Sequence, residues 1–258
     1  MDLYSLGIGV LFIAGTVAVA LSCYAISRRI AGDPEDQRTR DLAGSVLFRV
    51  AALHGLILAL VFAEELADHH ALHGSLVQEA SAVADIYYDI ERYGAPQAIQ
   101  EVVRGALSDY VRIVLTEEWP LLATDSRLSQ AAWDARERAY LAILDLAPSN
   151  RRQEDLRAHM LDNVQKIAAL RVARDVSARH HINPLFWLAA VVGLVFVTIP
   201  YFVFPPNWRN LVLLSVYGGF SGLIMFIIFA MADPFAKPAQ VQPTALERLL
   251  ERGIGTTN

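Results

Sequence analysis

The sequence predicts an all-α integral membrane protein with four membrane-spanning helices and a long helical bundle that extends from the membrane between spans 2 and 3. Of the 258 residues, 54% are hydrophobic, which exceeds the usual share in soluble domains. Charged residues make up only 19% and largely avoid four apolar stretches, each close to the ~20 residues that a helix needs to cross a bilayer. Elsewhere apolar residues recur at helical spacing, and no stretch shows the alternation of a strand.

Four stretches are predicted to span the membrane: Leu6–Ile26, Leu42–Ala63, Leu185–Phe204 and Leu211–Ala232. The first lacks the basic segment and the cleavage site of a signal peptide, so we expect a retained anchor. It contains the only cysteine, Cys23, and no intramolecular disulfide can form. In the last span, Gly218 and Gly222 form a GxxxG pattern, which either marks a tight helix contact or arises by chance.

The second span is predicted to continue into water as one helix from Asp41 to Tyr93. No proline interrupts it, and Gly94 followed by Pro96 stops it. Its extension carries four carboxylates: Glu79, Asp85, Asp89 and Glu91. Because no partner base, nucleophile or phosphate-binding loop accompanies them, we expect them to lie on a solvated face.

Three more helices are predicted in the soluble region. The first runs from Pro96 until Trp119-Pro120 breaks it, the second covers Ser129–Leu146, and the third runs from Asn150 to about His180. Since each buries little surface alone, we expect an antiparallel bundle with the extension of the second span. The predicted parts of the chain are two spans (1–66), the soluble bundle (67–182), two further spans (183–235) and a tail (236–258).

One narrow stripe of the second span combines apolar and ionisable residues. His54, Leu58, Val61 and Glu65 fall within about 60° of one another on the helix wheel. If several copies of this helix surrounded an axis, Leu58 and Val61 would form an apolar constriction between rings of His54 and Glu65. The alternative is that His54 hydrogen-bonds a neighbouring helix and Glu65 lies among lipid headgroups. A ring of glutamates favours cations, so the stripe alone does not argue for anions.

Histidines gather near one predicted membrane face. His69 and His73 follow the second span at i,i+4 spacing, which can serve one metal ion, and His180 and His181 precede the third span. Histidine titrates close to neutral pH, so a proton-sensing role is equally open. The remaining alternative is that these side chains are packed and solvated at the interface.

Several motifs, in this order and spacing, resemble the uncharacterised bacterial bestrophin-like membrane proteins. They are the segment from Leu47 through Val77-Gln78-Glu79-Ala80, Ala82–Tyr88, Glu117–Leu121, Asn183–Trp187 and Asp233–Phe235. Bestrophins are pentameric anion channels with four spans per subunit, cytoplasmic termini and a pore lined by the second span. The resemblance therefore implies a pentamer with a cytoplasmic middle region. Ala236 stands where bestrophins usually have glycine, and no acidic cluster follows, so their calcium gating is not expected here.

The resulting functional hypothesis is a homo-oligomeric ion channel of the bacterial inner (plasma) membrane, for which the resemblance implies anion conduction. The competing hypothesis is a non-conducting scaffold or sensor whose helical bundle docks a partner. The sequence has no catalytic triad signature, Walker motif, CxxC or HExxH, so we predict neither an enzyme nor a cofactor. The net charge of −5 gives no indication of nucleic-acid binding. The expected partners are the lipid bilayer, further copies of the chain and small ions.

Overall fold

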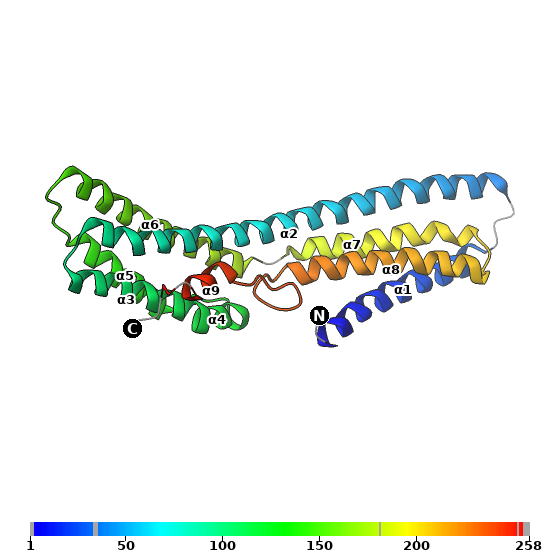
Figure 1. The fold of residues 1–258 in the computed structure, drawn as a ribbon. Coiled ribbons are helices and arrows are strands. Elements are labelled where there is room, and N and C mark those ends of the chain that lie inside the picture. Colours follow the sequence, from blue (N-terminus) through cyan, green and yellow to red (C-terminus); the bar gives the residue numbers. More distant parts are fainter. Residues whose placement is uncertain (1–2, 33–35, 181, 252, 255–258) are drawn as a thin grey trace. The chain divides into compact units, whose positions relative to one another are not determined.

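The computed structural model describes residues 3–32, 36–180, 182–251 and 253–254. Every regular element among them is a helix, as predicted. The chain forms two compact units: unit 1 comprises residues 1–67 and 181–232, and unit 2 comprises residues 68–180 and 233–258. Helix α2 (Gln37–Tyr93) is continuous, as predicted, and contributes its first part to unit 1 and the remainder to unit 2 (Figure 1).

Unit 1 consists of four helices that are long and apolar enough to cross a membrane, which confirms the four-span prediction. They are α1 (Leu3–Ala31), the first part of α2, α7 (Pro184–Thr198) with its 3-10 continuation η2 (Ile199–Val203), and α8 (Trp208–Met231). Only 11% of the most apolar window of α2 is buried within the chain. Most of its surface is therefore left for lipid or for other copies of the protein.

Helices α1 and α8 pack closely along each other through glycine. A methyl group at Gly222 would lie 2.8 Å from the carbonyl oxygen of Phe12 and 2.9 Å from Cα of Ile13, both on α1. A methyl group at Gly218 would lie 3.2 Å from Cα of Val17. The GxxxG pattern thus marks a tight helix contact rather than a chance run of small residues.

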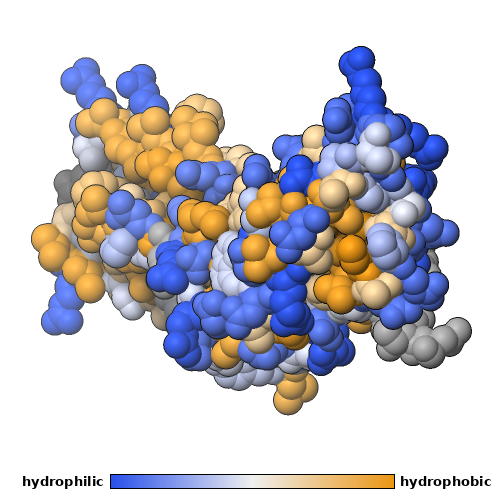
Figure 2. All heavy atoms as spheres, turned by 90° about the vertical axis from the view of Figure 1, so that its left-hand side faces the viewer, coloured by the Kyte–Doolittle hydropathy of each residue, from blue (hydrophilic) through white to orange (hydrophobic). Residues whose placement is uncertain are grey.

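Unit 2 is a helical bundle with one apolar core. It contains the end of α2, α3 (Gln97–Ile113), α4 (Trp119–Asp125), α5 (Gln130–Leu144), α6 (Arg151–Arg179) and α9 (Thr244–Glu251). Ile86 of α2, Val103 of α3, Ala135 of α5 and Val164 of α6 are fully buried in this core. The segment that follows the fourth span also packs into it, through Phe235 among others. Polar and apolar side chains both reach the surface on the face shown in Figure 2.

The prediction that Trp119-Pro120 breaks the helix begun at Pro96 was wrong. After α3 the chain passes through a π-helical turn, η1 (Val114–Glu118), and continues directly into α4. Pro120 is tolerated because it lies in the first turn of α4, next to the π turn, where the regular α-helical hydrogen-bond ladder is already interrupted. The helix ends instead at Ser126, whose backbone is left-handed with φ 49°.

Candidate functional site

The predicted stripe of α2 is the face that this helix turns toward the rest of unit 1. His54 and Leu58 are only 2% and 5% exposed, Glu65 is buried and Val61 is half-buried. Leu58 lies in an apolar cluster with side chains of α7 and α8, and Val61 packs against that cluster. His54, Leu58 and Glu65 are therefore buried within one chain, and Val61 is half-buried beside them.

His54 is hydrogen-bonded to two neighbouring helices. Its Nε2 lies 3.0 Å from the carbonyl oxygen of Ala190 on α7, and its Nδ1 lies 2.8 Å from the hydroxyl of Tyr217 on α8. Because a carbonyl oxygen only accepts, Nε2 donates, and Nδ1 is free to accept from Tyr217, which satisfies a neutral ring. A Cβ at Gly193 would come within 2.5 Å of the imidazole, so this close approach requires glycine. Hydrogen bonding to a neighbouring helix is the alternative that the sequence left open for His54.

The pore-lining role of His54, Leu58, Val61 and Glu65 stays a prediction. In a channel, lumen-facing side chains contact water, whereas His54 and Leu58 contact α7 and α8. They would reach a lumen only if those contacts opened.

The histidines near the predicted membrane face do not gather into one site among the described residues. His69 donates from Nε2 to the carbonyl oxygen of Ala239 at 2.9 Å and so holds the segment after the fourth span. His73 and His180 are exposed, and His181 lies outside the described residues. Within the described ranges, no three His, Cys, Asp or Glu side chains converge as metal ligands would.

Unit 2 contains a buried charged cluster centred on Glu118 of η1. Its Oε2 accepts from the backbone N–H of Ser129 at 3.0 Å and from the guanidinium of Arg171. Its Oε1 accepts from Nη1 of Arg174 at 3.1 Å. Glu118, Arg171 and Arg174 are all fully buried, so each charge depends on the others for its compensation.

Glu79 of α2 completes the cluster. Its carboxylate accepts from the Tyr110 hydroxyl and from Nη2 of Arg174. Burial, assisted by the charge of Glu79, raises the pKa of Tyr110 well above its usual value. Burial alone would lower the pKa of Arg174, but the neighbouring negative charges, Glu79 foremost, hold it above its ordinary value. The cluster therefore contains two carboxylates, two guanidiniums and a neutral phenol.

The expectation of a solvated carboxylate face on α2 was wrong for Glu79 and Asp89. Both are buried, because α6 covers this face with positively charged and imidazole side chains. Asp85 is half-buried, and Glu91 is exposed and pairs with Arg104 at 2.6 Å.

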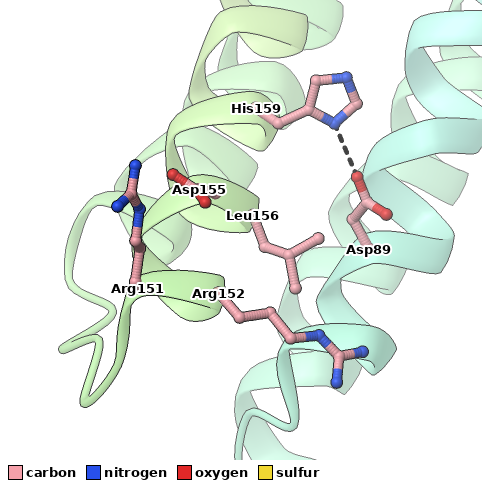
Figure 3. A pocket seen from close by; sticks show the side chains of 6 residues that line it. All are labelled: Asp89, Arg151, Arg152, Asp155, Leu156 and His159. Carbon is pink, nitrogen blue, oxygen red and sulfur yellow. Dashed lines mark hydrogen bonds and ion pairs between the residues drawn. The ribbon is translucent and has the colours of Figure 1, made fainter.

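An open pocket of about 600 Å³ lies between α2 and the first turns of α6 (Figure 3). Its lining residues are Asp89, Arg151, Arg152, Asp155, Leu156 and His159. Nδ1 of His159 lies 2.8 Å from Oδ2 of Asp89, and Nη1 of Arg92 donates to Oδ1 of Asp89 at 2.9 Å. No sequence pattern predicts this pocket, because its two sides are far apart in the chain.

The bestrophin-like domain family matches residues 14–246. Similar solved structures include a point variant of a bacterial bestrophin homologue from Klebsiella pneumoniae, with 13% identity, 95% of this chain and 98% of that chain covered, and a TM-score of 0.62. Another solved structure, of a point variant described as a membrane protein, shows 13% identity, 95% of this chain and 97% of that chain covered, and a TM-score of 0.63. No curated protein matches the sequence. The structural likeness shows a shared fold, and because the family match extends over most of the chain, the protein belongs to the bestrophin-like family.

Proposed function

We propose that the protein is an ion channel assembled from several copies of this chain, five by family likeness, in the bacterial inner membrane. The observation that carries the proposal is the family match, which includes all of α2, α7 and α8 in a family known for ion channels. The four apolar helices support a membrane location. In this proposal unit 2 lies in the cytoplasm, and anions are the first ions to test.

The proposed pore runs along α2, whose two faces differ. The face with His54 and Leu58 is occupied within the chain. On another face, Leu53 and Leu60 are 61% and 62% exposed, and Glu64 is exposed one turn further on. Exposed aliphatic side chains on a single membrane helix can face lipid. Brought to a common axis by several copies, they would form an apolar constriction beside a ring of carboxylates.

We therefore assign the constriction to the exposed face of α2 in preference to the predicted stripe. Leu53, Leu56, Leu60 and Glu64 lie within about 80° of one another at 100° per residue. No packed contact in unit 1 has to open for these side chains to reach a lumen. The two faces of α2 should therefore differ in their access to water-soluble reagents.

Cysteine accessibility in planar bilayers tests both the channel and the face. In a Cys23→Ser background, Leu53→Cys and Leu60→Cys would place thiols on the exposed face, and Leu58→Cys is the matched control on the packed face. A water-soluble, membrane-impermeant thiol reagent should reduce the current through the first two variants and leave the third unchanged. Block of Leu58→Cys alone would return the pore to the predicted stripe.

Ion selectivity follows from the reversal potential in asymmetric potassium chloride, where an anion channel and a cation channel give opposite signs. The absence of current in any salt between acid and neutral pH, for the protein and for a Leu53→Ala, Leu60→Ala variant that widens the proposed constriction, would overturn the channel proposal. A monomeric mass in detergent would overturn the oligomeric pore.

A further inference from the structure

The pocket between α2 and α6 holds charged groups that the channel proposal does not use. Its volume of about 600 Å³ is that of a small-molecule site, since such sites usually measure ~300–1,000 Å³. Figure 3 shows Arg152, Leu156 and His159 on successive turns of α6, with Asp89 of α2 opposite His159. The pocket therefore has a positive end, an apolar floor and an end where a carboxylate holds an imidazole.

Two arginines of this pocket lack partners. Most arginines of unit 2 bond to a carboxylate or a carbonyl oxygen, as Arg104 and Arg112 do. Within the described ranges, the side chains of Arg151 and Arg152 make neither an ion pair nor a hydrogen bond. Neighbouring Asp155 lies beyond ion-pair distance of both. Figure 3 shows the Arg152 side chain extending toward α2 below Leu156, whereas Arg151 leaves α6 on the other side, at the rim. The Arg152 guanidinium is thus the one that presents its donors to the pocket.

The position of these arginines in the chain adds to the positive potential. They occupy the first turn of α6, a helix of 29 residues, where the backbone dipole already favours negative charge. The same turn also carries Glu154. An anionic group bound at Arg152 would also interact favourably with this end of the helix.

The opposite end of the pocket offers fixed acceptors. Asp89 is almost completely buried, and its bonds from Arg92 and His159 hold the carboxylate in place. The His159 side chain is 53% exposed, so its ring borders the opening. Asp155 supplies a second carboxylate at the rim. Carboxylates accept hydrogen bonds from hydroxyl groups, and they repel a simple anion.

We propose that this pocket binds a small phosphate monoester that also carries hydroxyl groups, as a sugar phosphate does. The phosphate pairs with the guanidinium of Arg152, for which bidentate hydrogen bonding to phosphate is the preferred geometry. The hydroxyl groups donate to Asp89 or Asp155, and the carbon skeleton rests on Leu156. Binding of this ligand does not depend on conduction, so the channel proposal and this one fail separately.

Calorimetry on the purified full-length protein in detergent tests the proposal, with ribose 5-phosphate as the probe. Arg152→Gln should weaken binding at least about tenfold, because a hydrogen bond to a charged group is lost. The matched control is Lys166→Gln, which removes an exposed cation from the same helix outside the pocket. Ribose 5-phosphate should bind more tightly than either ribose or inorganic phosphate.

Three results would overturn the proposal. One is the absence of binding heat at millimolar ribose 5-phosphate under conditions where the protein is folded. Another is equal affinity in the Arg152→Gln and Lys166→Gln variants. The third is equal affinity for ribose and ribose 5-phosphate, which would mean that the pocket does not recognise the phosphate.

A lipid could present the same phosphate monoester, so the source needs its own measurement. The protein is placed in nanodiscs with and without phosphatidic acid, and ribose 5-phosphate is titrated into each. Unchanged affinity supports a soluble ligand. Competition by phosphatidic acid would overturn the soluble ligand and assign the pocket to a lipid headgroup.

Discussion

Replacing Glu118 with glutamine should remove a large part of the stability of unit 2, because the side chain keeps its volume but loses its charge. In the structure the carboxylate accepts from Arg171, from Arg174 and from the backbone N–H of Ser129. After the change, Arg174 retains Glu79 as a partner. Arg171 retains no carboxylate, and its remaining partners are neutral: the carbonyl oxygen of Ser129, the rings of Tyr110 and Trp133, and the new amide oxygen.

The size of the effect follows from the burial of Arg171. Its side chain is fully buried, so its charge cannot be solvated by water once Glu118 is neutral. Removing one partner of a buried ion pair costs ~3–5 kcal/mol, which corresponds to a fall in melting temperature of ~6–20 °C for a chain of this size. The matched control is Glu117→Gln, since Glu117 is exposed and, among the described residues, bonds only the hydroxyl of Ser129, at 2.6 Å. The control should lose about 1 kcal/mol or less.

Thermal unfolding in detergent, followed by tryptophan fluorescence, measures the difference. Trp133 and Trp119 both lie against the cluster, with ring centroids 4.2 Å from Cζ of Arg171 and 5.7 Å from Cζ of Arg174. Adding Arg171→Met to Glu118→Gln should recover part of the lost stability, because the unpaired charge is then gone. Melting temperatures of the Glu118 and Glu117 variants within about 2 °C of each other would refute the reasoning, since that gap is worth only ~1 kcal/mol or less.

Three further predictions concern other contacts. Gly222→Ala should destabilise unit 1 by ~1–3 kcal/mol, because its methyl group meets the backbone of α1. The control is Gly15→Ala, whose methyl group meets nothing within 4 Å, and melting in detergent compares the two variants. Tyr217→Phe should cost ~1–3 kcal/mol in the same assay, because it leaves Nδ1 of His54 unpaired in the interior, and an unchanged melting temperature would contradict that bond. The raised pKa of Tyr110 means that the unfolded chain loses this proton near pH 10 while the folded protein keeps it. Stability should therefore fall more steeply above pH 10 in the wild type than in Tyr110→Phe, and parallel profiles in a pH series of melting curves would disprove the assignment.

Properties that depend on one continuous stretch of chain were predictable. The apolar length of each span and the absence of proline between Asp41 and Tyr93 are local, and the four spans and the unbroken α2 are both found. The end of the helix begun at Pro96 was not predictable in this way. Proline inside a helix usually breaks it, and here the preceding π turn accommodates Pro120.

Helical periodicity shows which residues share a face but not what covers that face. His54 and Leu58 were correctly placed on one stripe, yet the sequence could not distinguish a shared axis of several copies from α7 and α8 of the same chain. The charged cluster did leave a signal. Arg171 and Arg174 continue the spacing of the buried Val164 and Ile167 on α6, but arginine is so often exposed that the pattern suggests a solvated end of the stripe.

The π turn makes the position of Glu118 depend on the number of residues in this segment. A π turn holds one more residue than the α-helix that it replaces. Loss of a single codon between Val114 and Glu118 would restore an uninterrupted helix, and the helical content of the protein would hardly change. Because a π turn rotates the chain about as far as an α turn with one residue fewer, the residues after the deletion would keep their orientation relative to α3. The segment should therefore tolerate the loss of one residue better than the gain of another, which would rotate the following residues by about 100° and separate Glu118 from the arginines.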